Sequence, residues 1–149
     1  MSFLYITADV IGGPGGGPSV TFQEAKALSE LGPTTVYGRQ YLEWQGPDPW
    51  KYDIAACQRI AFPTDLKLAH FYGGTFTETV RRLKERRVKV CYTIAAHDLA
   101  ASRKEHESMG VDFAKLYPHL CDPELWQRYI HGYRLADVIV CPSHLAANT

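Results

Sequence analysis

The sequence predicts an α/β protein with a Rossmann-like, three-layer arrangement around a mostly parallel central sheet. Short apolar segments typical of buried strands alternate with longer segments that have helical spacing. A glycine-rich loop, residues 12–17, joins the first predicted strand to the first predicted helix. Strand–helix–strand units of this length form right-handed parallel crossovers. The chain of 149 residues suits a single domain.

The first half of the chain begins with a predicted strand at residues 3–6. The apolar face of the helix after the glycine loop is expected to consist of Val20, Phe22, Ala25, Leu28 and Leu31. Gly32 would cap that helix and Pro33 would stop it. A second strand follows at 34–38, then a loop at 40–52 whose Trp44 and Trp50 either pack against the core or line a groove. Further strands are expected at 54–57 and 66–71.

The second half begins with a capping box formed by Thr75 and Glu78. Behind it, an apolar stripe is expected from Phe76, Val80 and Leu83. A strand at 88–94 leads into the sequence 95–98, and residues 100–118 are expected to cover the sheet edge as loop and short helix. Asp122 and Pro123 start a helix that runs to about Ala136, and a buried strand follows at 138–141. Pro142 and Ser143 would start one more helix, so we expect a chain that continues beyond Thr149.

Composition excludes several functional classes. The net charge is zero, so no overall field attracts nucleic acid, and a nucleic-acid partner is not expected. The basic run at 81–87 is typical of a solvated helix face, although it would also suit a peripheral contact with a membrane surface. There is neither a long apolar run nor a basic leader, and the four cysteines are widely spaced. We therefore expect a cytoplasmic protein with reduced, buried thiols.

The glycine loop is the strongest functional signal, because glycines at a helix start let backbone amides approach a ligand. The dinucleotide fingerprint is incomplete, since the third glycine position holds Pro18 or Val20. The P-loop pattern fails because Pro18 replaces the lysine. Either the loop binds a ligand or it is a flexible turn without one. If it binds, the expected binding residues are Gly12, Gly13, Gly15, Gly16 and Gly17.

Two further candidates lie where predicted parallel strands end, on the same edge of the sheet as the glycine loop. Gly73 and Gly74 follow the strand at 66–71, and His97 and Asp98 follow the strand at 88–94. His97 would act as a hydrogen-bond donor, an acid or a base, or would only cap a loop. Asp98 would orient the His97 ring or cap the next segment. No histidine spacing supports a metal site, and no cofactor is expected.

Four features resemble the N-terminal domain of retaining glycosyltransferases of the GT-B fold, family 4. They are the glycine loop with its helix through Glu24-Ala25 to Gly32, the segment 69–74, the strand ending in His97-Asp98, and the segment 134–143 with its Ala136-Asp137 pair. The last is the most specific, and the likeness spans nearly the whole chain. In this chain the loop has three additional glycines and two prolines, and Leu31-Gly32-Pro33 replaces the Gly-His that is usual there.

The resemblance implies that residues 1–149 are the acceptor-side half of a two-domain enzyme. The missing C-terminal GT-B domain would hold the nucleotide-sugar donor, and the acceptor is unknown. Glycine-loop amides would face the donor diphosphate or the acceptor, and His97 would contact the transferred sugar without a metal. The fragment alone should not turn over. Two rivals remain: a nicotinamide-dependent reductase, with Arg39 near a 2′-phosphate, and a non-catalytic binding module.

Overall fold

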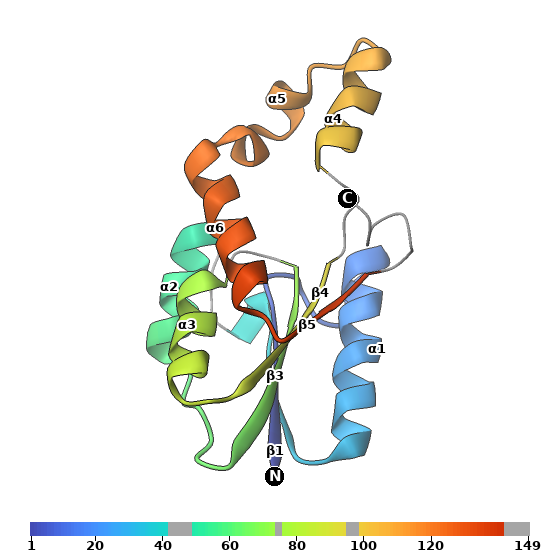
Figure 1. Ribbon diagram of the computed structural model, residues 1–149. Helices are drawn as coiled ribbons and strands as arrows, with labels where there is room; N and C mark the ends of the chain where they lie inside the picture. Colours follow the sequence, from blue (N-terminus) through green and yellow to red (C-terminus); the bar gives the residue numbers. More distant parts are fainter. Residues whose placement is uncertain (42–48, 74–75, 95–98, 142–149) are drawn as a thin grey trace.

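The computed structural model describes residues 1–41, 49–73, 76–94 and 99–141 (Figure 1). Its centre is a sheet of five parallel strands in the order β2-β1-β3-β4-β5. The strands are β1 (Ser2–Thr7), β2 (Thr34–Tyr37), β3 (Leu66–Tyr72), β4 (Lys89–Thr93) and β5 (Val138–Val140). The predicted α/β class and the parallel sheet are therefore confirmed.

Helices cover both faces of the sheet, as a three-layer Rossmann-like arrangement requires. One face carries α1 (Gly16–Leu31), and the other carries α2 (Pro49–Arg59), α3 (Thr77–Glu85) and α6 (Pro123–Leu135) (Figure 1). Strand β1 is buried along its whole length and serves both layers. Leu4 and Ile6 join the core under α2 and α3, whereas Phe3 and Tyr5 join the core under α1. This alternation follows from the two-residue period of a strand.

The segment 54–57 is helical and not a strand, so that prediction was wrong. Within α2, Asp53 and Ala56 are fully buried, and Ile60 just beyond its end is 2% exposed. These positions have the i, i+3, i+7 spacing of one helix face. Four consecutive apolar residues fit either a buried strand or a buried helix, and the sequence pattern alone did not separate the two.

Helix α3 begins differently from the expected capping box. Its N-cap residue is Phe76, and Thr75 lies outside the described residues. The buried carboxylate of Asp53 accepts hydrogen bonds from the amides of Glu78 (2.7 Å) and Thr79 (3.1 Å) and from the Thr79 hydroxyl (2.8 Å). A residue of α2 thus caps α3 and fixes the two helices to each other. The apolar stripe of Phe76, Val80 and Leu83 is fully buried, as predicted.

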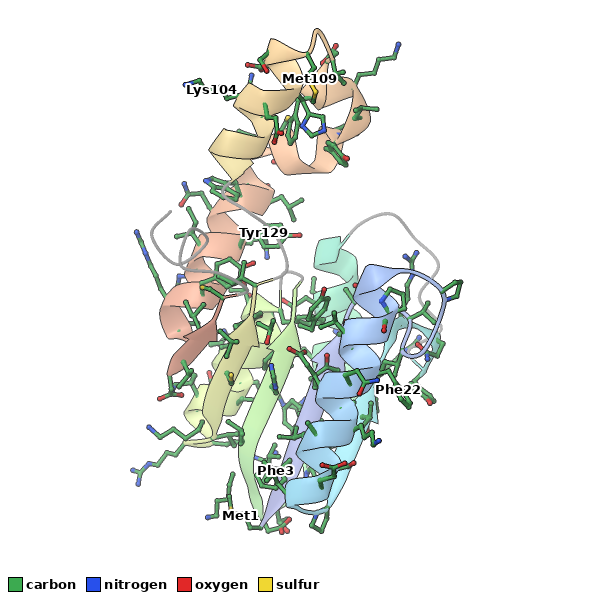
Figure 2. The ribbon with its side chains drawn as sticks, turned by 90° about the vertical axis from the view of Figure 1, so that its right-hand side faces the viewer. Met1, Phe3, Phe22, Lys104, Met109 and Tyr129 are labelled. Atoms are coloured by element: carbon green, nitrogen blue, oxygen red, sulfur yellow. The ribbon has the colours of Figure 1, made fainter. Side chains whose placement is uncertain are left out.

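Helix α1 packs through a face different from the one predicted. Ala25 and Leu28 are buried as expected, but Val20, Phe22 and Leu31 are 40%, 48% and 73% exposed. Figure 2 shows Phe22 on the outer side of α1. The buried face instead contains Thr21, which is fully buried, and the partly buried Glu24. The helix ends before Gly32, whose φ of 161° is extended and does not need glycine.

The C-terminal part of the chain departs from the prediction in two places. Strand β5 exists, but Val138, Ile139 and Val140 are 54%, 43% and 44% exposed because it is the edge strand. The segment 100–118, expected as loop and short helix over the edge, contains α4 (Leu99–Ser108) and α5 (Phe113–Leu116). These helices extend beyond the carboxyl ends of the strands (Figures 1 and 2).

The start of α6 is as predicted. Its N-cap is Asp122, whose carboxylate accepts from the amides of Glu124 and Leu125. Pro123 is the first helical residue, where its missing N–H costs nothing. The predicted helix at 143 falls outside the described residues. In the described part of the chain, no helix is long and apolar enough to cross a membrane.

The basic run at 81–87 is only partly a solvated face. The guanidinium groups of Arg82 and Arg86 lie over the ring of Phe62, 4.7 and 5.5 Å from its centre. Arg82 donates to the Cys57 carbonyl, and Arg86 donates to the carbonyls of Phe62 and Pro63. Arg82 and Arg86 therefore join α3 to the end of α2 and to the segment between α2 and β3 through hydrogen bonds and cation–π contacts.

Candidate functional site

The strand order places the carboxyl ends of β1 and β3 side by side. The chain leaves β1 toward β2 on one side, whereas β3 lies on its other side. In open α/β sheets, ligands bind at the strand ends where the connections diverge in this way. The glycine loop follows β1 and Gly73 follows β3, so two sets of predicted binding residues share this edge (Figure 1).

The glycine loop combines two conformational requirements with an uncapped helix start. Gly12 and Gly15 have φ values of 74° and 109°, in the left-handed region that favours glycine. Gly15 is also the N-cap of α1 and provides no side-chain hydrogen bond to it. Gly16 and Gly17 form the first turn of α1, where amides have no intrahelical acceptor. Gly13 has no positive φ, and a Cβ atom there would meet Val10 and Pro18 at an ordinary contact distance of 3.5 Å.

An aspartate that the sequence analysis did not select lies against this helix start. A Cβ atom on Gly17 would lie 2.8 Å from Oδ2 of Asp9, so a larger residue there would make the Asp9 side chain move. The Asp9 amide donates to the Thr7 hydroxyl at 3.0 Å, and the Arg39 amide donates to the Asp9 carbonyl at 3.1 Å. Partial burial raises the pKa of the Asp9 carboxyl, and the charge of Arg39 acts in the opposite direction.

Tyr72, at the end of β3, adds a second polar group at the same place. Its hydroxyl lies 3.9 Å from the position of a Gly17 Cβ atom, and the residue is 8% exposed. Burial raises the pKa of the Tyr72 phenol, and the nearby carboxylates of Asp9 and Glu24 raise it further. The hydroxyl therefore stays protonated and can donate a hydrogen bond.

A polar network between α1 and the sheet supports the site from below. The Tyr5 hydroxyl donates to Oε2 of Glu24 at 2.8 Å, and the Thr93 hydroxyl donates to Oε1 at 2.7 Å. The Thr93 oxygen also lies 2.8 Å from Nε2 of His70. Since Thr93 has one proton and gives it to Glu24, His70 must donate through Nε2. Burial lowers the pKa of His70, which favours the neutral ring.

The predicted site residues have different outcomes. Gly73 lies at the end of β3 with a φ of 57° and open space around its Cα. Gly74, His97 and Asp98 fall outside the described residues, so their placement at this edge stays a prediction. The sequence analysis missed Asp9 and Tyr72, although polar residues at or just after strand ends were a usable signal. It could not find the network, because Tyr5, Glu24, His70 and Thr93 come from four separate elements.

A hollow of about 320 Å³ lies where α6 meets the start of α3. Among the described residues it is lined by Thr77, Glu124, Gln127, Arg128, Ile130, His131 and Arg134. Arg128 is paired there with Glu124 at 3.3 Å, and its carbonyl accepts from the Thr77 hydroxyl. The bond between Thr77 and Arg128 joins α6 to α3.

All four cysteines are free, as expected, but Cys57, Cys91 and Cys141 are only half-buried and Cys121 is exposed. Within the described ranges, no group of three or more histidine, cysteine, aspartate or glutamate residues is arranged to hold a metal ion.

Comparisons with known proteins found no counterpart. A scan of protein-family models, a search of curated proteins and a search of solved structures each gave no match to this chain.

Proposed function

We propose that this chain is the acceptor-side domain of a glycosyltransferase that uses a nucleotide-sugar donor. The observation that carries the proposal is the shared edge at the carboxyl ends of β1 and β3. The glycine loop, the Asp9 carboxylate and the Tyr72 hydroxyl all meet there. A sugar acceptor needs hydrogen-bond acceptors and donors on a rigid frame, and such a frame is built here from two strands and a helix start.

The motifs that resemble family 4 enzymes supply the reaction class. In this proposal the missing C-terminal domain holds the nucleotide-sugar, and transfer occurs in the cleft between the two halves. His97 would hydrogen-bond the transferred sugar, and Asp98 would orient it. Amides in the first turn of α1 would face bound substrate. A peripheral membrane contact is a further part of the proposal if the acceptor is a lipid.

The reductase alternative is weaker because the carboxylate of Asp9 lies beside the start of α1. In dinucleotide-binding proteins the pyrophosphate lies at the N-terminus of the first helix. Here the carboxylate of Asp9 lies at that end of the helix and would repel a pyrophosphate, and the charge of Arg39 near Asp9 offsets part of this repulsion. The binding-module alternative shares the sheet edge and differs only in lacking turnover.

The test uses the native protein, recovered from source-cell lysate with an antibody raised against this chain. Immunoblotting first gives its size; a band of roughly twice 16.8 kDa or more is expected if a second domain of this kind is present. The recovered protein is then incubated with a panel of labelled nucleotide-sugars and a lysate acceptor fraction. Labelled glycoside, lost in a His97→Ala version, supports the proposal. NADPH oxidation without sugar transfer would favour the reductase, and neither activity would favour the binding module.

A further inference from the structure

We propose that the hollow between α6 and the start of α3 binds a phosphate monoester, and that His131 and Arg134 hold its phosphate group. The helices that form this hollow cover the face of the sheet opposite α1 (Figure 1). The proposal goes beyond the proposed function and does not depend on it, because it uses neither the glycine loop nor the strand ends beside it.

The first argument is the size of the hollow and the way α6 lines it. Its volume of about 320 Å³ lies at the lower end of the range for small-molecule sites, about 300–1,000 Å³. Gln127, His131 and Arg134 all line it and follow an i, i+4, i+7 spacing, which places them on one side of the helix. His131 lies about 6 Å along the helix axis from Gln127 and about 4.5 Å from Arg134. A ligand beside His131 is therefore within reach of both longer side chains.

The second argument is the charge of the lining. Among the described residues it contains two guanidinium groups, Arg128 and Arg134, and one carboxylate, Glu124. Arg128 and Glu124 form an ion pair at 3.3 Å, so their charges largely cancel. Arg134 adds a positive charge that this pair does not offset, and a protonated His131 adds a second. A phosphate monoester carries a charge of about −1.5 to −2 near neutral pH, which matches these two cations.

The third argument is unused hydrogen-bonding capacity. Within the described ranges, the side chains of Gln127, His131 and Arg134 form no hydrogen bond or ion pair. The Thr77 hydroxyl, in contrast, is used to join the helices, since it donates to the Arg128 carbonyl at 2.7 Å. A guanidinium presents five N–H donors in a fixed fork that fits phosphate oxygens, and the imidazole and amide add further donors. The lining thus provides three donor groups for a ligand.

The arrangement of the donors favours phosphate over a carboxylate. A carboxylate presents two oxygens in one plane, whereas a phosphate monoester presents three strong acceptor oxygens around a tetrahedral centre. Donors from three successive positions along α6 approach a ligand from different directions, which suits the tetrahedral group. Ile130 adds an apolar wall to the same hollow, against which the organic part of a monoester can pack.

The experiment is an NMR titration of the 149-residue chain with inorganic phosphate and with glycerol 3-phosphate. We expect saturable shifts of the α6 amides. Arg134→Gln should weaken phosphate binding by about tenfold, because a charge-assisted contact is lost. His131→Gln should weaken it by a smaller factor, because the ring is charged only when protonated. The control, Lys104→Gln, removes a positive charge from α4 (Figure 2) and should change the affinity by less than about twofold.

Glu124→Gln gives a prediction of opposite sign. It removes the carboxylate from the described lining and releases Arg128 from its ion pair, so phosphate binding should become tighter. Weaker binding by a folded Glu124→Gln variant would overturn the proposal, as would a wild-type chain whose α6 amides do not shift. Equal weakening by Arg134→Gln and Lys104→Gln would also overturn it, because binding would then follow net charge alone. A two-dimensional amide spectrum checks that each variant is folded.

The phosphate monoester can be a free molecule or the headgroup of a lipid, and a vesicle assay distinguishes the two. Vesicles of phosphatidylcholine are compared with vesicles of phosphatidylcholine and phosphatidic acid. Co-sedimentation with the second kind alone, reduced in Arg134→Gln, supports the proposal with a lipid headgroup as the source. Binding of glycerol 3-phosphate without co-sedimentation supports it with a free ligand. A chain that binds neither overturns it.

Discussion

Replacing Glu24 with alanine should destabilise the fold strongly, although Glu24 is an ionisable residue on a helix with an exposed side. Its carboxylate accepts hydrogen bonds from Tyr5, which is fully buried, and from Thr93, which is 8% exposed. Alanine leaves the Tyr5 hydroxyl without an acceptor and leaves the Thr93 hydroxyl with His70 Nε2, at 2.8 Å, as its one remaining partner in the described part of the chain. Each buried unsatisfied polar group costs about 1–3 kcal/mol. The Glu24 side chain is 19% exposed, so water can enter and relieve part of this cost. We expect a loss of about 3 kcal/mol in the free energy of unfolding.

Glutamine at the same position should cost less, about 1 kcal/mol. Its amide oxygen can accept from Thr93, and its NH₂ group can donate to the Tyr5 oxygen, so only the Tyr5 proton loses its acceptor. The matched control is Glu30→Ala, an exposed position on the same helix. Exposed substitutions of this kind usually change stability by less than about 0.5 kcal/mol.

Urea-induced unfolding, followed by circular dichroism, measures all three variants. The reasoning would be refuted if the free energies of unfolding of Glu24→Ala and the Glu30→Ala control differed by less than about 1 kcal/mol. Loss of a hydrogen-bond acceptor for a buried hydroxyl should cost more than that. The prediction also tests the site, since the same network positions α1 and the glycine loop. Pyrophosphate and glycoside titrations of Glu24→Gln would show whether loosening this network alters binding.

The remaining predictions concern buried polar groups elsewhere in the fold. Asp53→Ala removes the cap of α3 and should cost about 3 kcal/mol in urea unfolding, from a lost cap and unpaired amides; a cost below about 1 kcal/mol would contradict the capping role. Burial raises the pKa of Asp53 to about 6, so the folded state holds its proton more tightly and stability should rise as pH falls from about 6 to 4. Asp53→Asn should remove that rise. Burial lowers the pKa of His70, so its contribution has the opposite sign: stability should fall as pH drops below about 6.5, and His70→Gln should abolish this fall in a pH series of unfolding measurements. A ¹⁵N spectrum of the histidine rings should show His70 as the Nε2–H tautomer at neutral pH, and an Nδ1–H ring would contradict the assigned hydrogen bond to Thr93.

The sequence was sufficient to predict the sheet because its strands have a local signal. Residues 3–6, 66–71 and 88–94 are apolar runs bounded by turn residues, and each became a strand. The segment 54–57 was ambiguous because it is too short to show a period. Its helical state depends on Asp53, which is buried against the start of α3 and receives hydrogen bonds from it. That long-range contact is absent from any local window.

The face of α1 was mispredicted for a related reason. Apolar residues were expected to point inward, so Val20 and Phe22 were assigned to the core. The inward face instead carries Thr21, which donates to the Pro18 carbonyl, and Glu24, which serves the polar network. A polar residue becomes buried when partners from other strands satisfy it, and those partners are known only once the fold is known.

The sequence was sufficient to predict where the candidate site lies, but not which side chains form it. Glycines after strand ends pointed to the correct edge of the sheet, because parallel strands bring their carboxyl ends together. The chemistry at that edge depends on which side chains meet there. Asp9 precedes the loop by three residues and Tyr72 lies in the middle of the chain, yet both approach the same point beside Gly17. They come together because β1 and β3 pair in a register that sets Thr7 opposite Tyr72.

The motif that most specifically resembles family 4 enzymes turns out to serve the fold. Asp137 accepts hydrogen bonds from Lys84 at 2.6 Å, from Lys89 at 3.1 Å and from the Val90 amide at 2.8 Å. These bonds hold the pKa of the Asp137 carboxyl well below its usual range and join α3 and β4 to the chain entering β5. Because Asp137 makes these structural contacts, the motif supports the architecture more than the activity. The proposed function therefore depends on the edge beside Gly17, where the glycine loop, the Asp9 carboxylate and the Tyr72 hydroxyl lie together.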